Sequence, residues 1–190
     1  MRNGEGGFVM PKTREAAERQ AERSKRALAE GLLALLAEKD LPELSVTMLC
    51  ERTHVSRTTF YRHFSRLEDV LAWYVDGLLA TYTQTHPVGR DYADDVREFV
   101  TGMPLSRELL KMLHDRHLMW VLGDAFERRV AFAMGGENFV RLLGEPRYAD
   151  YQQRFIVDTL LSVLGTWVER GFAERPEELA EVLAKLVVTV

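Results

Sequence analysis

Two short helical patterns, separated by a tight turn, lie between positions 45 and 64 and limit what this chain can fold into. The first covers Ser45–Arg52 and the second Val55–Phe64, with two residues between them. Helical periodicity also dominates the rest of the sequence, whereas β-branched runs with strict alternation are missing. The sequence therefore predicts an all-α protein that contains a helix-turn-helix unit.

Polar residues stand where these two helices should begin and end. Ser45 or Thr47 can cap the first helix, and Ser56 is a natural N-cap for the second. His54 lies at the turn, where a residue often adopts the left-handed conformation that histidine tolerates better than most residues. The first-turn amides of the second helix would then point toward a bound phosphate.

The second helix combines a basic face with an aromatic one. From Arg52 to Arg66 the chain has four arginines, two histidines and no acidic residue. Phe60 and Phe64 are four positions apart and should face inward, so that arginine, threonine and tyrosine side chains face elsewhere. A short helix of this kind suits the major groove of DNA, where cationic and hydroxyl groups reach phosphate oxygens and base edges.

The distribution of charge is compatible with DNA binding. The chain has a formal net charge of −4, but residues 11–70 hold 11 basic and 10 acidic residues, while residues 71–190 hold 13 and 18. The acidic excess thus lies in the C-terminal two thirds of the chain. One small basic face can bind DNA even when the net charge of the whole chain is negative.

A long helix is expected to precede the helix-turn-helix unit, and a series of helices to follow it. The expected helical segments are 12–38, 67–83, 91–101, 106–122, 123–134, 137–143, 147–170 and 176–190. His86–Gly89 is the clearest linker, and we expect residues 1–11 to be disordered. One cysteine, no signal peptide and no apolar run of membrane-spanning length favour a cytoplasmic protein.

Residues 25–75 resemble the DNA-binding domain of the TetR family of transcriptional regulators. The resemblance is carried by Ser45-Val46, Leu49–Arg52 and above all Val55–Phe64, with Leu67, Glu68 and Leu71 behind them. It implies an N-terminal three-helix, helix-turn-helix DNA-binding domain at residues 12–66. It further implies a C-terminal helical domain for ligand binding and dimerisation at residues 67–190. His54 departs from the family pattern, in which a glycine is common at this position.

Two groups of side chains on or beside the second helix are assigned to DNA. Those expected to reach base edges or nearby phosphates are Arg57, Thr58, Thr59 and Arg62. Those placed to bind phosphates, as the resemblance also implies, are Thr47, Ser56, Tyr61, His63 and Arg66. The alternatives are an ordinary solvated helix face, a half-buried aromatic at Tyr61 and a packing histidine at His63.

The C-terminal half is rich in large side chains, and in the TetR family a cavity in this region binds a small effector. The candidate pocket residues are Trp73, Tyr74, Phe99, His114, His117, Trp120, Phe126 and Trp167. Aromatic residues at helical spacing are also typical of an ordinary core. His114 and His117 could ligate a metal, but no carboxylate or cysteine cluster clearly completes a site, so we expect no metal and no cofactor.

The last two helices carry a broader apolar arc than one buried face requires. A second copy of the chain could cover the additional face and form a homodimer. The interface residues expected on this basis are Leu160, Leu164, Trp167, Leu179, Leu183 and Leu186. The alternative is that both faces are covered within one chain.

The sequence leads to the hypothesis of a homodimeric transcriptional regulator, more readily a repressor than an activator. It would bind a near-palindromic double-stranded DNA operator and be released by an unknown small-molecule effector. The two reading helices must then be separated by about 34–36 Å, one helical turn of DNA, or by a multiple of it.

The competing hypothesis is an all-helical small-molecule-binding protein or enzyme without DNA binding. Against an enzyme, the sequence has no nucleophile–base pairing, phosphate-binding glycine loop or well-spaced metal signature. A protein–protein adaptor would leave the acid-free run from Arg52 to Arg66 unexplained.

Overall fold

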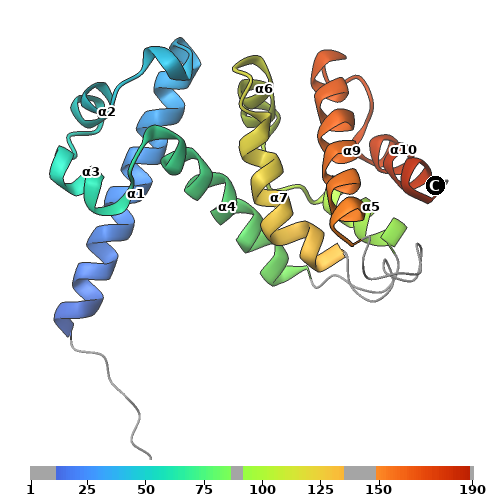
Figure 1. Cartoon of the computed structure of the whole chain (residues 1–190), viewed down its shortest axis with the longest axis horizontal. Coiled ribbons are helices and arrows are strands. Elements are labelled where there is room, and N and C mark those ends of the chain that lie inside the picture. Colours follow the sequence, from blue (N-terminus) through green and yellow to red (C-terminus); the bar gives the residue numbers. More distant parts are fainter. Residues whose placement is uncertain (1–11, 87–91, 135–148, 189–190) are drawn as a thin grey trace, which may run out of the picture. The chain divides into compact units, whose positions relative to one another are not determined.

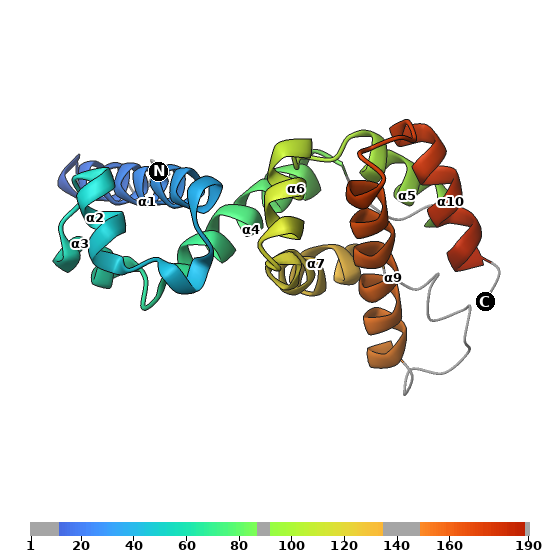
Figure 2. The same cartoon turned by 90° about the horizontal axis from the view of Figure 1, so that it is seen from above.

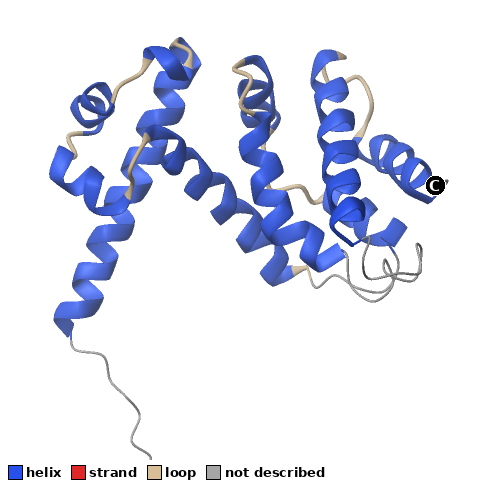
Figure 3. Cartoon of the chain, in the orientation of Figure 1, coloured by secondary structure: helices blue, strands red, loops and turns tan. Residues whose placement is uncertain are grey.

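The computed structural model describes residues 12–86, 92–134 and 149–188. Within these ranges the regular secondary structure is helical and includes no strand (Figure 3), which confirms the all-α prediction. The helices, in chain order, are α1 (Lys12–Glu38), the 3-10 helix η1 (Leu41–Glu43), α2 (Val46–Thr53), α3 (Arg57–His63), α4 (Leu67–Thr85), α5 (Tyr92–Thr101), α6 (Arg107–Asp115), α7 (Met119–Met134), α9 (Ala149–Glu169) and α10 (Pro176–Val188). None of these helices is both long enough and apolar enough to cross a membrane. The expected disordered residues 1–11 and the expected short helix 137–143 lie outside the described ranges.

Contacts between residues divide the chain into two compact units. The first ends at Val70 and the second begins at Leu71, so that the boundary falls inside α4. The first unit therefore contains α1, α2 and α3, and the second contains α5 to α10.

The core of the first unit forms where the C-terminal half of α1 meets α2 and α3 (Figures 1 and 2). Leu28, Leu32 and Leu36 recur every four residues on α1 and are fully buried, as the helical stripe in the sequence predicts. Leu49 of α2 and Phe60 of α3 are fully buried as well. These two residues fix the orientation of both short helices on α1.

The second unit is a layered set of helices. Helix α7 packs along α9, α6 also contacts α9, and α10 lies mainly against α5 (Figures 1 and 2). Its core includes an aromatic column in which Phe99 meets Tyr82 and Phe126 edge-on, each with ring centroids 5.3 Å apart. Periodicity predicts the apolar face of α10, but the partner of that face, α5, emerges only from the fold.

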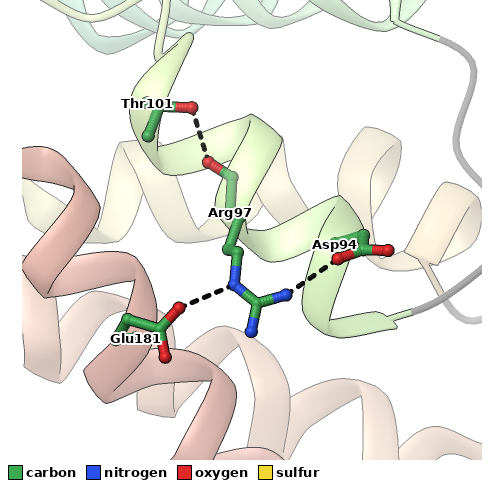
Figure 4. Close-up of polar contacts among 4 residues, drawn as sticks. All are labelled: Asp94, Arg97, Thr101 and Glu181. Carbon is green, nitrogen blue, oxygen red and sulfur yellow. Dashed lines mark hydrogen bonds and ion pairs between the residues drawn. The ribbon is translucent and has the colours of Figure 1, made fainter.

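A surface ion-pair network also joins α5 to α10 (Figure 4). The guanidinium of Arg97 donates to Glu181 through Nε and to Asp94 through Nη1, both at 2.8 Å. All three side chains are more than two fifths exposed, so water and salt screen their attraction. Such screened surface pairs contribute little to stability, and the buried apolar faces of the two helices hold them together.

One predicted helix boundary in the second unit is wrong. The sequence placed a break before Gly123, whereas the chain turns at His117, between α6 and α7. His117 has a φ of 57°, and the backbone N–H of Leu118 donates to the carbonyl of Leu113. Gly123 lies inside α7, where a Cβ atom would stand 2.9 Å from Cδ1 of Leu161 in α9. This glycine permits a close approach of two helices and does not end one.

Candidate nucleic-acid interface

Helices α2 and α3 begin at serine caps and α2 ends at His54, as the sequence predicts. The Ser45 hydroxyl accepts a hydrogen bond from the backbone N–H of Met48 at 3.2 Å. His54 ends α2 in the left-handed conformation, with φ 55° and ψ 24°. The Ser56 hydroxyl accepts from the backbone N–H of Thr59 at 3.1 Å. These caps place α3 directly after a sharp turn.

The inner side of α3 is aromatic. Phe60 is fully buried and Phe64 is 7% exposed, with ring centroids 6.0 Å apart, so both predicted inward residues are confirmed. Tyr61 meets the Phe60 ring edge-on at 5.2 Å but keeps 53% of its surface exposed. The tyrosine thus has a fixed ring position and an accessible outer edge.

The outer side of α3 carries cations without acidic partners. Arg57, Thr58 and Arg62 are exposed. Neither Arg57 nor Arg62 forms an ion pair or a side-chain hydrogen bond with any residue in the described ranges. Elsewhere arginines are commonly paired; Arg154 and Arg170, for example, each lie 2.6 Å from a glutamate oxygen. The charge of α3 is therefore left available for an external anion.

The remaining predicted contact residues differ in how far their polar groups are already engaged. Thr47 is exposed at the start of α2. The hydroxyls of Ser56 and Thr59 lie 2.9 Å apart and bond to each other, so both also serve the cap of α3. Arg66 pairs with Asp69 at 3.3 Å, although its side chain remains 67% exposed. Ser56, Thr59 and Arg66 are thus engaged within the first unit, whereas Arg57 and Arg62 have no partner among the described residues.

Asp69 is a residue that the site prediction did not include. Its carboxylate accepts hydrogen bonds from the backbone N–H groups of Ser65 at 2.8 Å and Arg66 at 3.0 Å, at the start of α4. Burial alone would raise the pKa of Asp69, but these amides and the Arg66 guanidinium lower it below its ordinary value. An acid in the first turn of a helix is the sequence signal for such a cap.

The arginines of α3 influence two titratable groups of the first unit. Burial of the half-buried His63 lowers the pKa of its imidazole, and the charges of Lys25 and Arg62 lower it further. A neutral imidazole can donate a hydrogen bond to a phosphate but adds no positive charge. Burial raises the pKa of the Cys50 thiol against the opposing effect of Arg57, so this cysteine stays protonated inside the unit.

The predicted pocket residues are dispersed over several environments. The buried ones are Phe99, Phe126 and Trp167. The half-buried ones are Trp73, Tyr74 and His114, and the exposed ones are His117 and Trp120. The structure brings Phe99 and Phe126 into contact. Trp167 is engaged in the turn after α9, where its Nε1 donates to the carbonyl of Glu174 at 2.9 Å. Their assignment to an effector site stays a prediction.

His114 has acidic neighbours on both sides of its ring. Its Nε2 lies 3.4 Å from a Glu169 oxygen of α9, and its Nδ1 lies 3.5 Å from Asp115. The ring packs on α9 at Gly165, where a Cβ atom would be 3.6 Å from Cδ2. Across the ranges 12–86, 92–134 and 149–188, no three His, Cys, Asp or Glu side chains converge as a metal ion would require.

The predicted dimer residues are largely covered by the chain itself. Five of them are buried within one chain: Leu160, Leu164, Trp167, Leu179 and Leu183. The sixth, Leu186, is 47% exposed. Three further apolar side chains on the same two helices are exposed: Tyr151 by 76%, Phe155 by 46% and Val182 by 45%. Among the side chains of α9 and α10 whose burial is described, these four are the large apolar ones that stay exposed.

Comparisons with known proteins give one informative result. No family model matches the chain, and no curated protein matches its sequence significantly. Among solved structures, the chain is similar to a TetR transcriptional regulator from Streptococcus agalactiae 2603V, with a TM-score of 0.62 and 17% sequence identity. The match covers 91% of this chain and 98% of that chain. At this identity the likeness shows the fold.

Proposed function

We propose that this chain is a cytoplasmic, sequence-specific DNA-binding transcriptional regulator that inserts α3 into the major groove. The observation that carries the proposal is the two-sided character of α3. Phe60 anchors the helix in the core, while Arg57 and Arg62 are exposed and lack acidic partners in the described ranges. The likeness of the fold to a TetR transcriptional regulator supports the same function.

The outer face of α3 supplies two kinds of contact. Arg57, Thr58 and Arg62 read base edges, and a bidentate arginine–guanine contact provides about 1–3 kcal/mol of discrimination against other bases. Phosphate contacts from the surrounding groups fix the helix in register without reading sequence. These groups are Thr47, Ser56, Thr59, Tyr61, His63 and Arg66. His63 acts as a neutral donor, because its pKa is lowered.

A homodimer completes the proposal. Val182 and Leu186 are four residues apart on α10, and Tyr151 and Phe155 have the same spacing on α9, so each pair presents one exposed apolar face. A two-fold interface between copies of the chain would cover them. Two copies of α3 would then meet successive major grooves about 34–36 Å apart, which requires a near-palindromic operator.

The proposed mode of action is repression that a small-molecule effector relieves. A bound dimer can block a polymerase without making further contacts. An effector in the second unit changes DNA affinity only to the extent that it binds one arrangement of the dimer more tightly than another. Helix α4 belongs to both units, so a displacement of α4 in the second unit reaches the first through one continuous helix.

Selection from a random duplex library tests the proposal. The full chain should enrich a near-palindromic sequence, and binding of the enriched duplex should be measured by fluorescence anisotropy. The double variant Arg57→Ala/Arg62→Ala should lose at least tenfold in affinity while keeping its helical circular dichroism. Lys111→Ala, which removes a cation of the second unit that is paired with Asp115, should bind like the wild type. Enrichment of no sequence, or equal affinity of the double variant, would contradict the proposal.

A further inference from the structure

The N-terminal half of α1 does not take part in the core of the first unit. Every side chain from Arg14 to Gln20 is exposed, and the first fully buried residue of the helix is Leu28. Tertiary packing stabilises only the other half of α1, so helix formation in this half depends on local contacts.

The arginines of this segment divide into a paired and an unpaired group. Arg14 lies 3.1 Å from Glu18 and Arg19 lies 3.4 Å from Glu15, which are ordinary ion pairs one helical turn apart. Arg23 is exposed and has no ion-pair partner in the described ranges.

Arg26 shares this property with Arg23. It is exposed, and it forms neither an ion pair nor a side-chain hydrogen bond with any residue that the structure describes. The two side chains are three positions apart on one helix and therefore lie on the same face, within one turn of each other. Together they resemble Arg57 and Arg62 of α3 in being accessible cations of the first unit with no internal acid to neutralise them.

This part of α1 also lies beside α3. Lys25, which stands between the two arginines in sequence, is close enough to His63 for its charge to lower the pKa of the imidazole. His63 is the last residue of α3, directly after Arg62. Arg23 and Arg26 flank this position in sequence, so the stretch of α1 that carries them lies near the C-terminal end of the helix that we place in the groove.

We infer that Arg23 and Arg26 form a second DNA contact, binding backbone phosphates next to the groove that α3 occupies. Guanidinium groups suit this role because their planar donors match the oxygens of a phosphate. Contacts of this kind add affinity and register but read no base. The inference rests on the proposed function, and it extends the DNA-binding surface from α3 onto α1.

The salt dependence of DNA binding tests the inference. Each phosphate contact steepens the slope of log K against log salt by about 0.9, so Arg23→Ala/Arg26→Ala should make the slope shallower by about 1.8. The substitutions should leave α1 helical, because alanine has the highest helix propensity. The probes are the duplex enriched by selection and a random-sequence duplex of equal length. The double variant should lose the same factor in affinity for both duplexes, so that its sequence preference is unchanged.

Lys39→Ala is the control, because Lys39 is an exposed cation of the first unit just beyond the C-terminal end of α1, with no ion-pair partner in the described ranges. Its slope should stay within experimental error of the wild type. An unchanged slope in the arginine double variant would overturn the inference and leave the proposed function intact. Equal changes in the Lys39 variant would overturn it too, since they would reflect net charge alone. Failure of the wild type to bind either duplex would overturn the proposed function and the inference together.

Discussion

Replacing Phe60 with alanine should strongly destabilise the first unit while leaving the outer face of α3 chemically unchanged. Phe60 is fully buried and contacts the ring of Phe64, so truncation removes apolar surface from the core and leaves a cavity. Changes of this kind cost about 3–5 kcal/mol. Phe60→Leu keeps most of the volume and should cost roughly 1–2 kcal/mol by the same reasoning.

That cost is large relative to the stability of the unit. Residues 12–70 of the first unit are described, and domains are stable by roughly 0.05–0.15 kcal/mol per residue. The first unit should therefore have a free energy of unfolding of roughly 3–9 kcal/mol, of which Phe60→Ala would remove a third or more. Arg57→Ala, at an exposed position without a partner, should change it by less than about 0.5 kcal/mol.

Urea unfolding followed by circular dichroism, together with the amide spectrum of the first unit, measures both effects. Because the chain has two compact units, the curve should be fitted with two transitions, and the mutation should shift the earlier transition or merge it into the baseline. A shift of less than 1 kcal/mol for Phe60→Ala, or an equal shift for Arg57→Ala, would refute the division of α3 into a buried and an exposed face.

Three further predictions concern stability, each read from urea midpoints. Asp69→Ala removes the cap of α4 and should cost about 1 kcal/mol at neutral pH. Because the folded-state pKa of Asp69 is lowered, its stabilisation is present above the ordinary carboxyl pKa and is lost as the pH falls through the lowered value. The stabilities of the variant and the wild type should therefore converge in acid. Asp76→Ala deprives Arg129 of a carboxylate at 2.6 Å and should cost about 1 kcal/mol, because the pair is only partly buried; no loss would show that the pair is neutral to stability. Gly77→Ala, with open space around it in α4, should stabilise by about 0.5–1 kcal/mol, whereas Gly123→Ala should gain nothing because its Cβ would press on α9; equal gains would contradict the close approach.

Local chemistry explains why the caps of α2 and α3 and the inward side of α3 were predictable from the sequence. Ser45 and Ser56 cap their helices, and His54 ends α2, through backbone contacts within three or four residues. Phe60 and Phe64 face inward because a helix brings residues four positions apart to one side. Each of these features depends on neighbours in the chain, so a single sequence contains the information.

Features that depend on distant residues were not predictable in the same way. Gly123 suggests a helix end when read locally, yet its role is set by Leu161 of α9. Leu179 and Leu183 were assigned to a dimer, but they are buried within the chain, where α10 lies mainly against α5. Periodicity identifies an apolar face without identifying what covers it. The exposed face of α10 instead includes Val182.

Contact between DNA and the outer face of α3 is directly observable by NMR. Amide chemical shifts of the isotope-labelled full chain should be followed while the selected duplex is added. The largest shift changes should occur at Arg57–Arg62, with smaller changes at Arg23 and Arg26 and little change at the buried Leu164 of α9. Shift changes confined to the second unit, or none in α3 while the duplex is bound, would contradict that contact.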